Sequence, residues 1–254
     1  MKIHHLRNAT LIIETDQHKI LVDPMLGPKG SGAPFTLFRF KPRRNPTVDL
    51  PANAPQLLEG ITHCIVTHLH PDHLDDMAID FLTSKNIPVV GSHHDLPTLQ
   101  KKGLNVVLSM RHWEQKEFLG GKILSVPAIH GYGFVKKIAG YVMGVHLELP
   151  GQPSIYISSD TVYTEHVDKI LKEYAPDITV MAAGKAQLDI GQPLLMHEQD
   201  QVKFVEHSPG RVFANHMESL NHCPFTREKL KHLLKSKGLL EKVDIPVDGG
   251  VVQY

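Results

Sequence analysis

Thr67-His68-Leu69-His70-Pro71-Asp72-His73-Leu74-Asp75 is the stretch from which the organisation of this chain can be worked out. Three histidines and one carboxylate fall within six positions, in the order His-x-His-x-Asp-His. Imidazole nitrogens bind zinc, iron and manganese, and a carboxylate suits a hard or borderline divalent ion. A run of this density can surround two ions rather than one. The alternative is a polar loop of solvated histidines, because the chain holds 18 histidines in 254 residues.

The composition indicates a globular protein with a sizeable core. Lys+Arg and Asp+Glu both total 27, so the formal net charge is zero, which disfavours a dedicated nucleic-acid binder. Two cysteines give no disulfide framework, and no apolar run approaches membrane-spanning length. We therefore expect a cytoplasmic protein with no membrane and no nucleic-acid partner, and the sequence leaves a homo-oligomer open.

Strand and helix patterns alternate along the chain. Residues 10–14 and 19–23 flank Asp16-Gln17-His18 and predict a hairpin. Helices are expected over 75–82 and 95–102, around Val167 to Tyr174, and from Thr226 to Gly238. The remaining strands are expected over residues 64–67, 87–90, 122–126, 141–149, 154–158, 178–181, 212–214 and 243–247. One layered α/β domain over residues 1–254 is the simplest fit.

Residues 24–50 differ in character from the rest of the chain. They hold five prolines, three glycines and five basic residues, with phenylalanines interspersed, and predict a long ordered active-site loop. Its arginines could clamp a phosphate or carboxylate, and its phenylalanines could line an apolar wall. The alternative is a solvated basic edge with ordinary packing aromatics. The residues predicted to bind an anionic small-molecule substrate are Arg39, Arg43, Arg44 and Lys185.

Three later residues extend the opening run. His130, Asp160 and His216 each lie just past an apolar strand, where a rigid scaffold can hold a loop residue in place. Each of them alone would be an ordinary structural residue. Together with residues 68–73, and in this order, they indicate a site for two metal ions.

The order His-x-His-x-Asp-His, His, Asp, His resembles the metallo-β-lactamase superfamily over nearly the whole chain. The resemblance implies a four-layer αββα sandwich, of the α/β class, with a metal site at one edge of the two sheets. It implies one ion on His68, His70 and His130 and a second on Asp72, His73 and His216. Asp160 would bridge the two ions. Zinc is the expected metal, and manganese or iron also suits such a donor set.

Within the superfamily, the chain resembles the branch with L-ascorbate-6-phosphate lactonase-like and N-acylphosphatidylethanolamine phospholipase D-like proteins. The supporting stretches are residues 7–14, 20–24 and Ile157-Ser158-Ser159-Asp160-Thr161. The branch usually carries glycine where this chain has Ser159. The segment from Met217 to Cys223 does not match the branch, which leaves the substrate pocket open.

The implied chemistry is hydrolysis. Two divalent ions would share a water and lower its pKa, and the resulting hydroxide would attack a small ester, lactone or phosphoester. Asp72 is the candidate to orient this nucleophile as well as to bind metal. Tyr132, Lys185 and His222 are candidates for the acid that protonates the leaving group, with an ordinary surface or supporting role as the alternative for each.

Three other functions fit parts of the pattern. A nuclease or phosphodiesterase of the same fold would use the same ions, but the neutral charge counts against it. A di-iron oxygen or nitric oxide reductase would carry glutamate where this chain has His70. A metal-binding protein without turnover would keep the same ligands.

Overall fold

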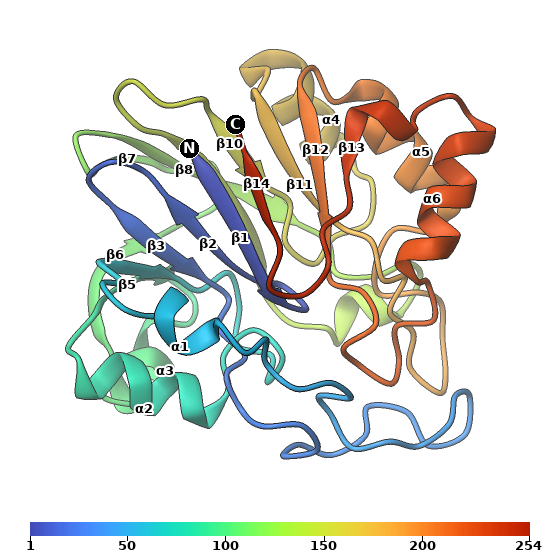
Figure 1. Ribbon diagram of the computed structural model, residues 1–254, viewed down its shortest axis with the longest axis horizontal. Coiled ribbons are helices and arrows are strands. Elements are labelled where there is room, and N and C mark those ends of the chain that lie inside the picture. The colour runs from blue at the N-terminus through green and yellow to red at the C-terminus, as the bar shows by residue number, and fades with distance from the viewer.

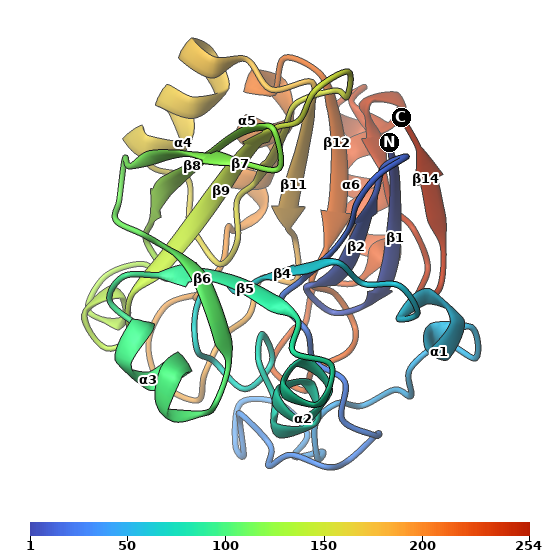
Figure 2. The same ribbon diagram turned by 90° about the vertical axis from the view of Figure 1, so that its left-hand side faces the viewer.

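Two seven-stranded sheets face each other, and helices cover the outer face of each sheet (Figures 1 and 2). This computed structural model describes residues 1–254. The first sheet runs in the order β14 (Val251–Gln253), β1 (Lys2–Arg7), β2 (Thr10–Glu14), β3 (Lys19–Val22), β4 (His63–Ile65), β5 (Pro88–Ser92) and β6 (Asn105–Met110). The second runs in the order β13 (Val243–Asp244), β12 (Arg211–Asn215), β11 (Ile178–Ala182), β10 (Ile155–Ile157), β9 (Val142–Glu148), β8 (Gly121–Ala128) and β7 (Gln115–Phe118).

Both sheets are mixed, and each has a parallel part beside an antiparallel part. In the first sheet β3 to β6 are parallel neighbours, and in the second β10 to β13 are. The helices are α1 (Ala54–Leu57), α2 (Asp76–Ser84), α3 (Leu96–Lys101), α4 (Glu165–Lys169), α5 (Glu198–His207) and α6 (Arg227–Ser236). Short helical turns η1 (Val135–Lys137), η2 (Ile170–Tyr174) and η3 (Leu240–Lys242) complete the set.

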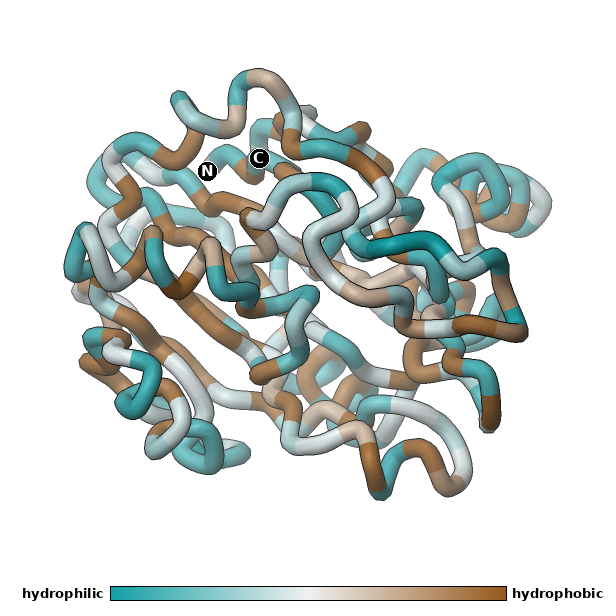
Figure 3. The backbone as a smooth tube through the Cα atoms, turned by 90° about the horizontal axis from the view of Figure 1, so that it is seen from below, coloured by the Kyte–Doolittle hydropathy of each residue, from teal (hydrophilic) through white to brown (hydrophobic).

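Alternating side chains explain the layers. On β2, Leu11 and Ile13 belong to the apolar cluster between the sheets, together with Val145 and Ile157 of the second sheet. Ile12 points the other way and joins the cluster beneath α2 and α3. A third cluster lies between the second sheet and α4, α5 and α6. In Figure 3 long brown stretches run through the middle of the molecule, and teal is frequent at its outer turns. The predicted four-layer αββα sandwich is confirmed.

Most predicted elements are present. The 10–23 hairpin is β2 and β3, paired antiparallel, and Thr226 caps α6 by accepting from the amide of Lys229. The strand expected over 243–247 is shorter, because Pro246 has no N–H to donate to a ladder. The predictions did not include α1, α5, β1, β6, β7 or β14. No helix of the structure combines the length and the apolar character needed to cross a membrane.

The loop over residues 24–50 contains no helix or strand, as expected, and runs along the bottom of the molecule in both views (Figures 1 and 2). Asn221 anchors it from the far end of the chain. The Asn221 side chain accepts from the amide of Phe35 at 2.9 Å and donates to the Thr36 carbonyl at 2.8 Å. The main-chain amide of Asn221 donates to the side-chain oxygen of Asn45 at 2.8 Å. The loop is therefore held in place over one edge of the sandwich.

Candidate metal centre

The predicted ligands follow four strands whose carboxyl ends lie at the same edge. The run from His68 to His73 follows β4, and the three later ligands follow β8, β10 and β12. The ligands of the second sheet are His130, Asp160 and His216. The two sheets are joined beside the site, because the Met143 amide donates to the Thr67 carbonyl at 3.2 Å. Strand ends of this kind are rigid positions from which loop residues can converge.

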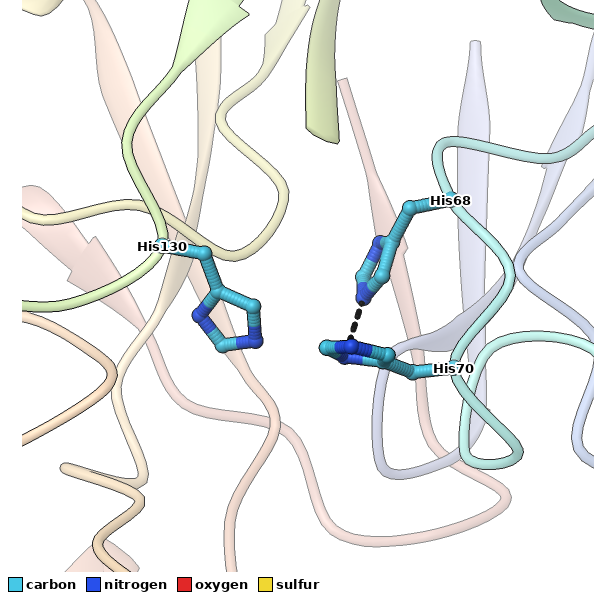
Figure 4. A group of neighbouring side chains, drawn as sticks. All are labelled: His68, His70 and His130. Atoms are coloured by element: carbon cyan, nitrogen blue, oxygen red, sulfur yellow. Dashed lines mark hydrogen bonds between the residues drawn. The ribbon is translucent and has the colours of Figure 1, made fainter. Parts of the chain in front are cut away.

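One cluster consists only of histidines. Ligand nitrogens of His68, His70 and His130 lie within 4.8 Å of one another, and His68 Nε2 lies 3.0 Å from His70 Nδ1. His130 faces the other two rings from the opposite side of a gap (Figure 4). Burial lowers the pKa of His130 to about 4 and holds the pKa of His68 well below its usual value. The rings are therefore neutral, with lone pairs free for a metal ion.

The second cluster combines two carboxylates with two histidines. Ligand atoms of Asp72, His73, Asp160 and His216 lie within 4.8 Å of one another, and all four residues are buried. Nε2 of His73 lies 3.3 Å from Nε2 of His216, and the latter lies 3.2 Å from Oδ2 of Asp72. Burial raises the pKa of Asp160, but His216 and His73 outweigh it and hold this pKa well below its usual value.

Asp160 lies between the two clusters. Its Oδ2 is 3.4 Å from Nε2 of His130, and its Oδ1 is 3.3 Å from Nε2 of His73. Oδ1 is buried and makes no hydrogen bond of acceptable geometry. A buried carboxylate oxygen without a donor is costly unless a cation satisfies it. The residues present therefore fit a bound metal ion in each cluster, with Asp160 reaching both.

Residues that contact Nδ1 of the ligand histidines fix the orientation of the imidazole rings. Oδ2 of Asp23 lies 2.9 Å from Nδ1 of His73, and the Leu194 carbonyl lies 3.0 Å from Nδ1 of His130. Asp23 also accepts from the amide and the hydroxyl of Thr67, each at 2.8 Å. Such contacts fix the tautomer, so that the other ring nitrogen is free for metal.

Several residues at this edge have left-handed backbone. Asp23, Ser159 and His216 have φ values of 46°, 54° and 60°. Residues other than glycine rarely adopt this conformation, and it concentrates at functional sites. The value at Ser159 is one that glycine adopts without strain. In this backbone conformation the Ser159 hydroxyl donates to Thr67 Oγ1 at 2.7 Å.

A cavity of about 200 Å³ opens onto both clusters. Its polar side includes His222, whose ring packs edge-on against Phe35 with centroids 4.8 Å apart. The apolar side comes from three loops far apart in the sequence. The cavity is lined by Phe35, His70, Pro71, Asp72, His130, Val135, Ile138, Ala139, Asp160, Leu188, Leu194 and His222.

Of the three acid candidates, the structure brings only His222 to this cavity. The Tyr132 hydroxyl donates to Asp200, and its ring stacks on His197 with centroids 4.9 Å apart. Tyr132 lines a separate hollow. The ammonium of Lys185 pairs with both carboxylate oxygens of Glu198 at 2.8 Å.

The predicted anion-binding residues also lie elsewhere. Arg39 donates to the carbonyls of Asp189 and Gly191, and Arg44 donates to those of Gly30 and Ser31. Arg43 is exposed. None of these three arginines, nor Lys185, lines the cavity over the metal clusters.

Several site residues were missing from the sequence-based set. Asp23 follows β3 in the way the predicted ligands follow their strands, so the same rule could have identified it. Asn8, whose side-chain amide donates to the Asp72 carbonyl at 3.2 Å, lies in a β-turn and carries no such signal. Of the apolar residues at the site, Val135 begins the short helical turn η1, Ile138 follows that turn and Leu188 lies in a loop, and none of them belongs to a periodic pattern.

Known proteins share this fold and much of this sequence. A family model described as the beta-lactamase superfamily domain matches residues 18–217. The UPF0173 protein YddR of Bacillus subtilis is 32% identical over 253 residues, which cover 98% of each chain.

Solved structures agree. A possible metal-dependent hydrolase from Veillonella parvula superposes with a TM-score of 0.91 at 29% identity, covering 99% of this chain and 98% of that chain. An isothiocyanate hydrolase from Delia radicum gut bacteria gives the same TM-score and identity, covering 100% and 99%. The chain thus has the metallo-β-lactamase fold and belongs to the beta-lactamase superfamily.

Proposed function

We propose that the chain, a metal-dependent hydrolase of the metallo-β-lactamase fold, uses two divalent ions to hydrolyse a small ester, lactone or phosphoester. One ion would be held by His68, His70 and His130, and the other by Asp72, His73 and His216. Asp160 would contribute to both. Zinc suits this histidine-rich set best, and manganese or iron is compatible with its carboxylates.

Bound divalent ions would supply a water of lowered pKa and would polarise the substrate oxygen. The protein contributes the positions of the reacting groups. Asp72 lines the cavity and is held from behind, because the Asn8 amide donates to its main-chain carbonyl at 3.2 Å. From this position Asp72 would accept a hydrogen bond from the attacking water and orient it toward the substrate.

His222 would protonate the leaving group. It lines the same cavity as Asp72 and is buried, with Nδ1 lying 4.0 Å from Cys223 Sγ. Burial alone would lower the pKa of His222, but Cys223 and Asp72 raise it above its ordinary value. A protonated imidazole at the cavity wall is suited to give a proton to a departing alkoxide or amine.

A second candidate substrate is an isothiocyanate. The isothiocyanate hydrolase noted above aligns over the whole of this chain at 29% identity. Water adding to the central carbon of R–N=C=S would give an amine, R–NH₂, and carbonyl sulfide. The same two groups would serve, because Asp72 would orient the water and His222 would protonate the nitrogen.

The observation that carries the proposal is that both clusters open onto one cavity. The test is elemental analysis of the purified protein coupled to a panel of lactone, ester, thioester, phosphodiester and isothiocyanate substrates. His68→Ala should remove metal and hydrolysis together, while His232→Ala, at an exposed histidine on α6, should change neither. Hydrolysis at full rate in His68→Ala would refute the proposal. Stoichiometric metal without turnover on any substrate would instead indicate a metal-binding protein.

A further inference from the structure

We propose that the apolar wall of the cavity selects substrates with a neutral, apolar substituent of about the size of one ring. The apolar wall is formed by Phe35, Val135, Ile138, Ala139, Leu188 and Leu194. This inference rests on the proposed hydrolase function and deepens it, because it names the class of substrate that the same site would take.

The apolar wall is a packed surface. Val135, Ala139 and Leu194 are buried and belong to one apolar cluster, against which Phe35 and Leu188 pack. Ile138 stands at the mouth of the cavity with 69% of its surface exposed. Apolar walls with a few convergent polar groups are typical of small-molecule sites. An apolar substituent would therefore find a preformed surface opposite the metal clusters.

A carboxylate ties the loops of the apolar wall together. Asp189, one residue after Leu188, accepts from the hydroxyl of Thr36 and from the amide of Phe38 at 2.9 Å. Two further amides, those of Leu37 and Arg39, donate to it at 2.8 Å. The loop that carries Phe35 is thus fastened to the loop that carries Leu188. The amide of Tyr132 fastens the third loop, donating to the Pro193 carbonyl at 3.1 Å.

The charges around the cavity argue against an anionic substituent. No lysine or arginine lines it, and its only ionisable residues are two carboxylates and three histidines. Arg39, which lies on a neighbouring loop, is engaged with main-chain carbonyls. An anionic group placed against the apolar wall would lose its hydration without gaining a partner.

The volume limits the size of the substituent. The cavity measures about 200 Å³. An apolar cavity of about 150 Å³ is large enough to hold benzene. A ring or a chain of about six carbons would therefore fill the space beside the apolar wall when the reactive carbon lies next to the metal clusters. Much larger substituents would have to project past Ile138 into solvent.

The test compares matched substrates that differ by one charge. Metal-loaded protein would be assayed with phenyl acetate and 4-carboxyphenyl acetate, and with phenyl isothiocyanate and 4-carboxyphenyl isothiocyanate. We expect the added carboxylate to lower kcat/KM by about tenfold or more in each pair. Equal kcat/KM values within both pairs would overturn the inference while leaving the hydrolase function intact.

Ile138 is an exposed position of the apolar wall at which a charged side chain can be introduced. Ile138→Lys should raise kcat/KM for the carboxylate substrates and narrow the ratio within each pair, whereas Ile138→Asp should widen it. Ile190→Lys is the matched control, because Ile190 is also exposed, at 76%, but does not line the cavity. If Ile138→Lys and Ile190→Lys shift the ratio equally, the apolar wall does not set the preference.

A binding measurement separates this inference from the proposed function. Ethylbenzene added to metal-free protein should shift the methyl NMR signals of Val135, Ala139 and Leu188, with saturation, and Ile138→Asp should weaken the binding. Saturable shifts without turnover of any substrate would support the apolar wall and refute the hydrolase. Absence of shifts at these methyl groups would overturn the apolar wall whatever the activity.

Discussion

Oδ2 of Asp23 lies 2.9 Å from Nδ1 of His73, so that Nε2 of the same ring faces the second metal cluster. The same oxygen accepts from the hydroxyl of Thr67, and the other oxygen accepts from the Thr67 amide. Asp23 is 2% exposed and has no contact with the cavity. Its role is therefore to hold the ring of His73, once metal binding has removed a proton, in the tautomer that leaves Nε2 free.

Asp23→Asn should weaken metal binding without removing a ligand. The amide oxygen would keep the bond from the Thr67 amide, and the NH₂ group would then face Nδ1 of His73 and favour the wrong tautomer. Loss of such a supporting contact typically weakens metal affinity by about 10–100-fold. Competition titration with a chromophoric zinc chelator would measure this, with Asp16→Asn, at an exposed turn, as control. Unchanged affinity for both ions would contradict this role for Asp23.

Substitution of His222 should affect substrates according to their leaving groups. In His222→Gln, kcat for ethyl butanoate should fall by about 100-fold, because ethoxide needs a proton to depart. The kcat for p-nitrophenyl butanoate should fall far less, since nitrophenolate departs without needing a proton. Metal content should stay at the wild-type level. Equal losses for the two esters would show that His222 does not donate the proton.

Metal binding should release protons at pH 7.5. Burial alone would lower the pKa of His73, but Asp160, Asp23 and Asp72 raise it to about 10 in the metal-free protein. The pKa of His216 is also raised, because Asp160 and Asp72 outweigh burial. Both rings are then protonated at pH 7.5 and must lose a proton to bind metal. Calorimetric titration in buffers of different ionisation enthalpy should show release of about two protons from these rings. Release of none would show that these rings are neutral before metal binds.

Gly184→Ala should disturb the second metal cluster, because the added methyl group would displace His216. A Cβ added there would lie 2.0 Å from the carbonyl oxygen of His216, so the main chain has to move. Overpacking of this kind destabilises by about 1–3 kcal/mol, and displacement of His216 should weaken metal binding as well. Urea unfolding of metal-free Gly184→Ala would measure the stability. Gly32→Ala, whose added Cβ would lie 3.3 Å from the nearest atom, is the control, and equal stability of the two variants would contradict the argument.

The sequence predicted those features that depend on local pattern. The 10–23 hairpin and α6 follow from periodicity and turn residues, and both are present. The helix α5 was missed, because Glu198–His207 is largely polar and buries only Gln201, Phe204 and Val205. The edge strand β14 was missed because it pairs with β1, at the other end of the sequence. The edge strand β7 pairs locally with β8, but its sequence, Gln-Lys-Glu-Phe, is mostly polar and carries no strand signal.

At the site, the order of ligands could be recognised because each follows a strand. The cavity could not, because it depends on contacts between distant loops. Asp189 holds Thr36 across 153 positions of sequence, and no local pattern indicates that pairing. Nor does any local pattern indicate that Arg39 and Arg44 donate to main-chain carbonyls and lie outside the lining of the cavity. Of the loop's predicted roles, the phenylalanine wall has support in Phe35, which lines the cavity.

If two ions act together across Asp160, hydrolysis should depend on the number of ions bound per chain. Metal-free protein would be titrated with zinc while bound metal, by elemental analysis, and hydrolysis are followed in parallel. We expect saturation at two ions per chain, with hydrolysis rising to its maximum only as the second ion binds. Asp160→Asn should bind fewer ions and lose most of its activity. Full activity in metal-free protein, or with one ion in the wild type and in Asp160→Asn alike, would show that hydrolysis does not need a second ion held by Asp160.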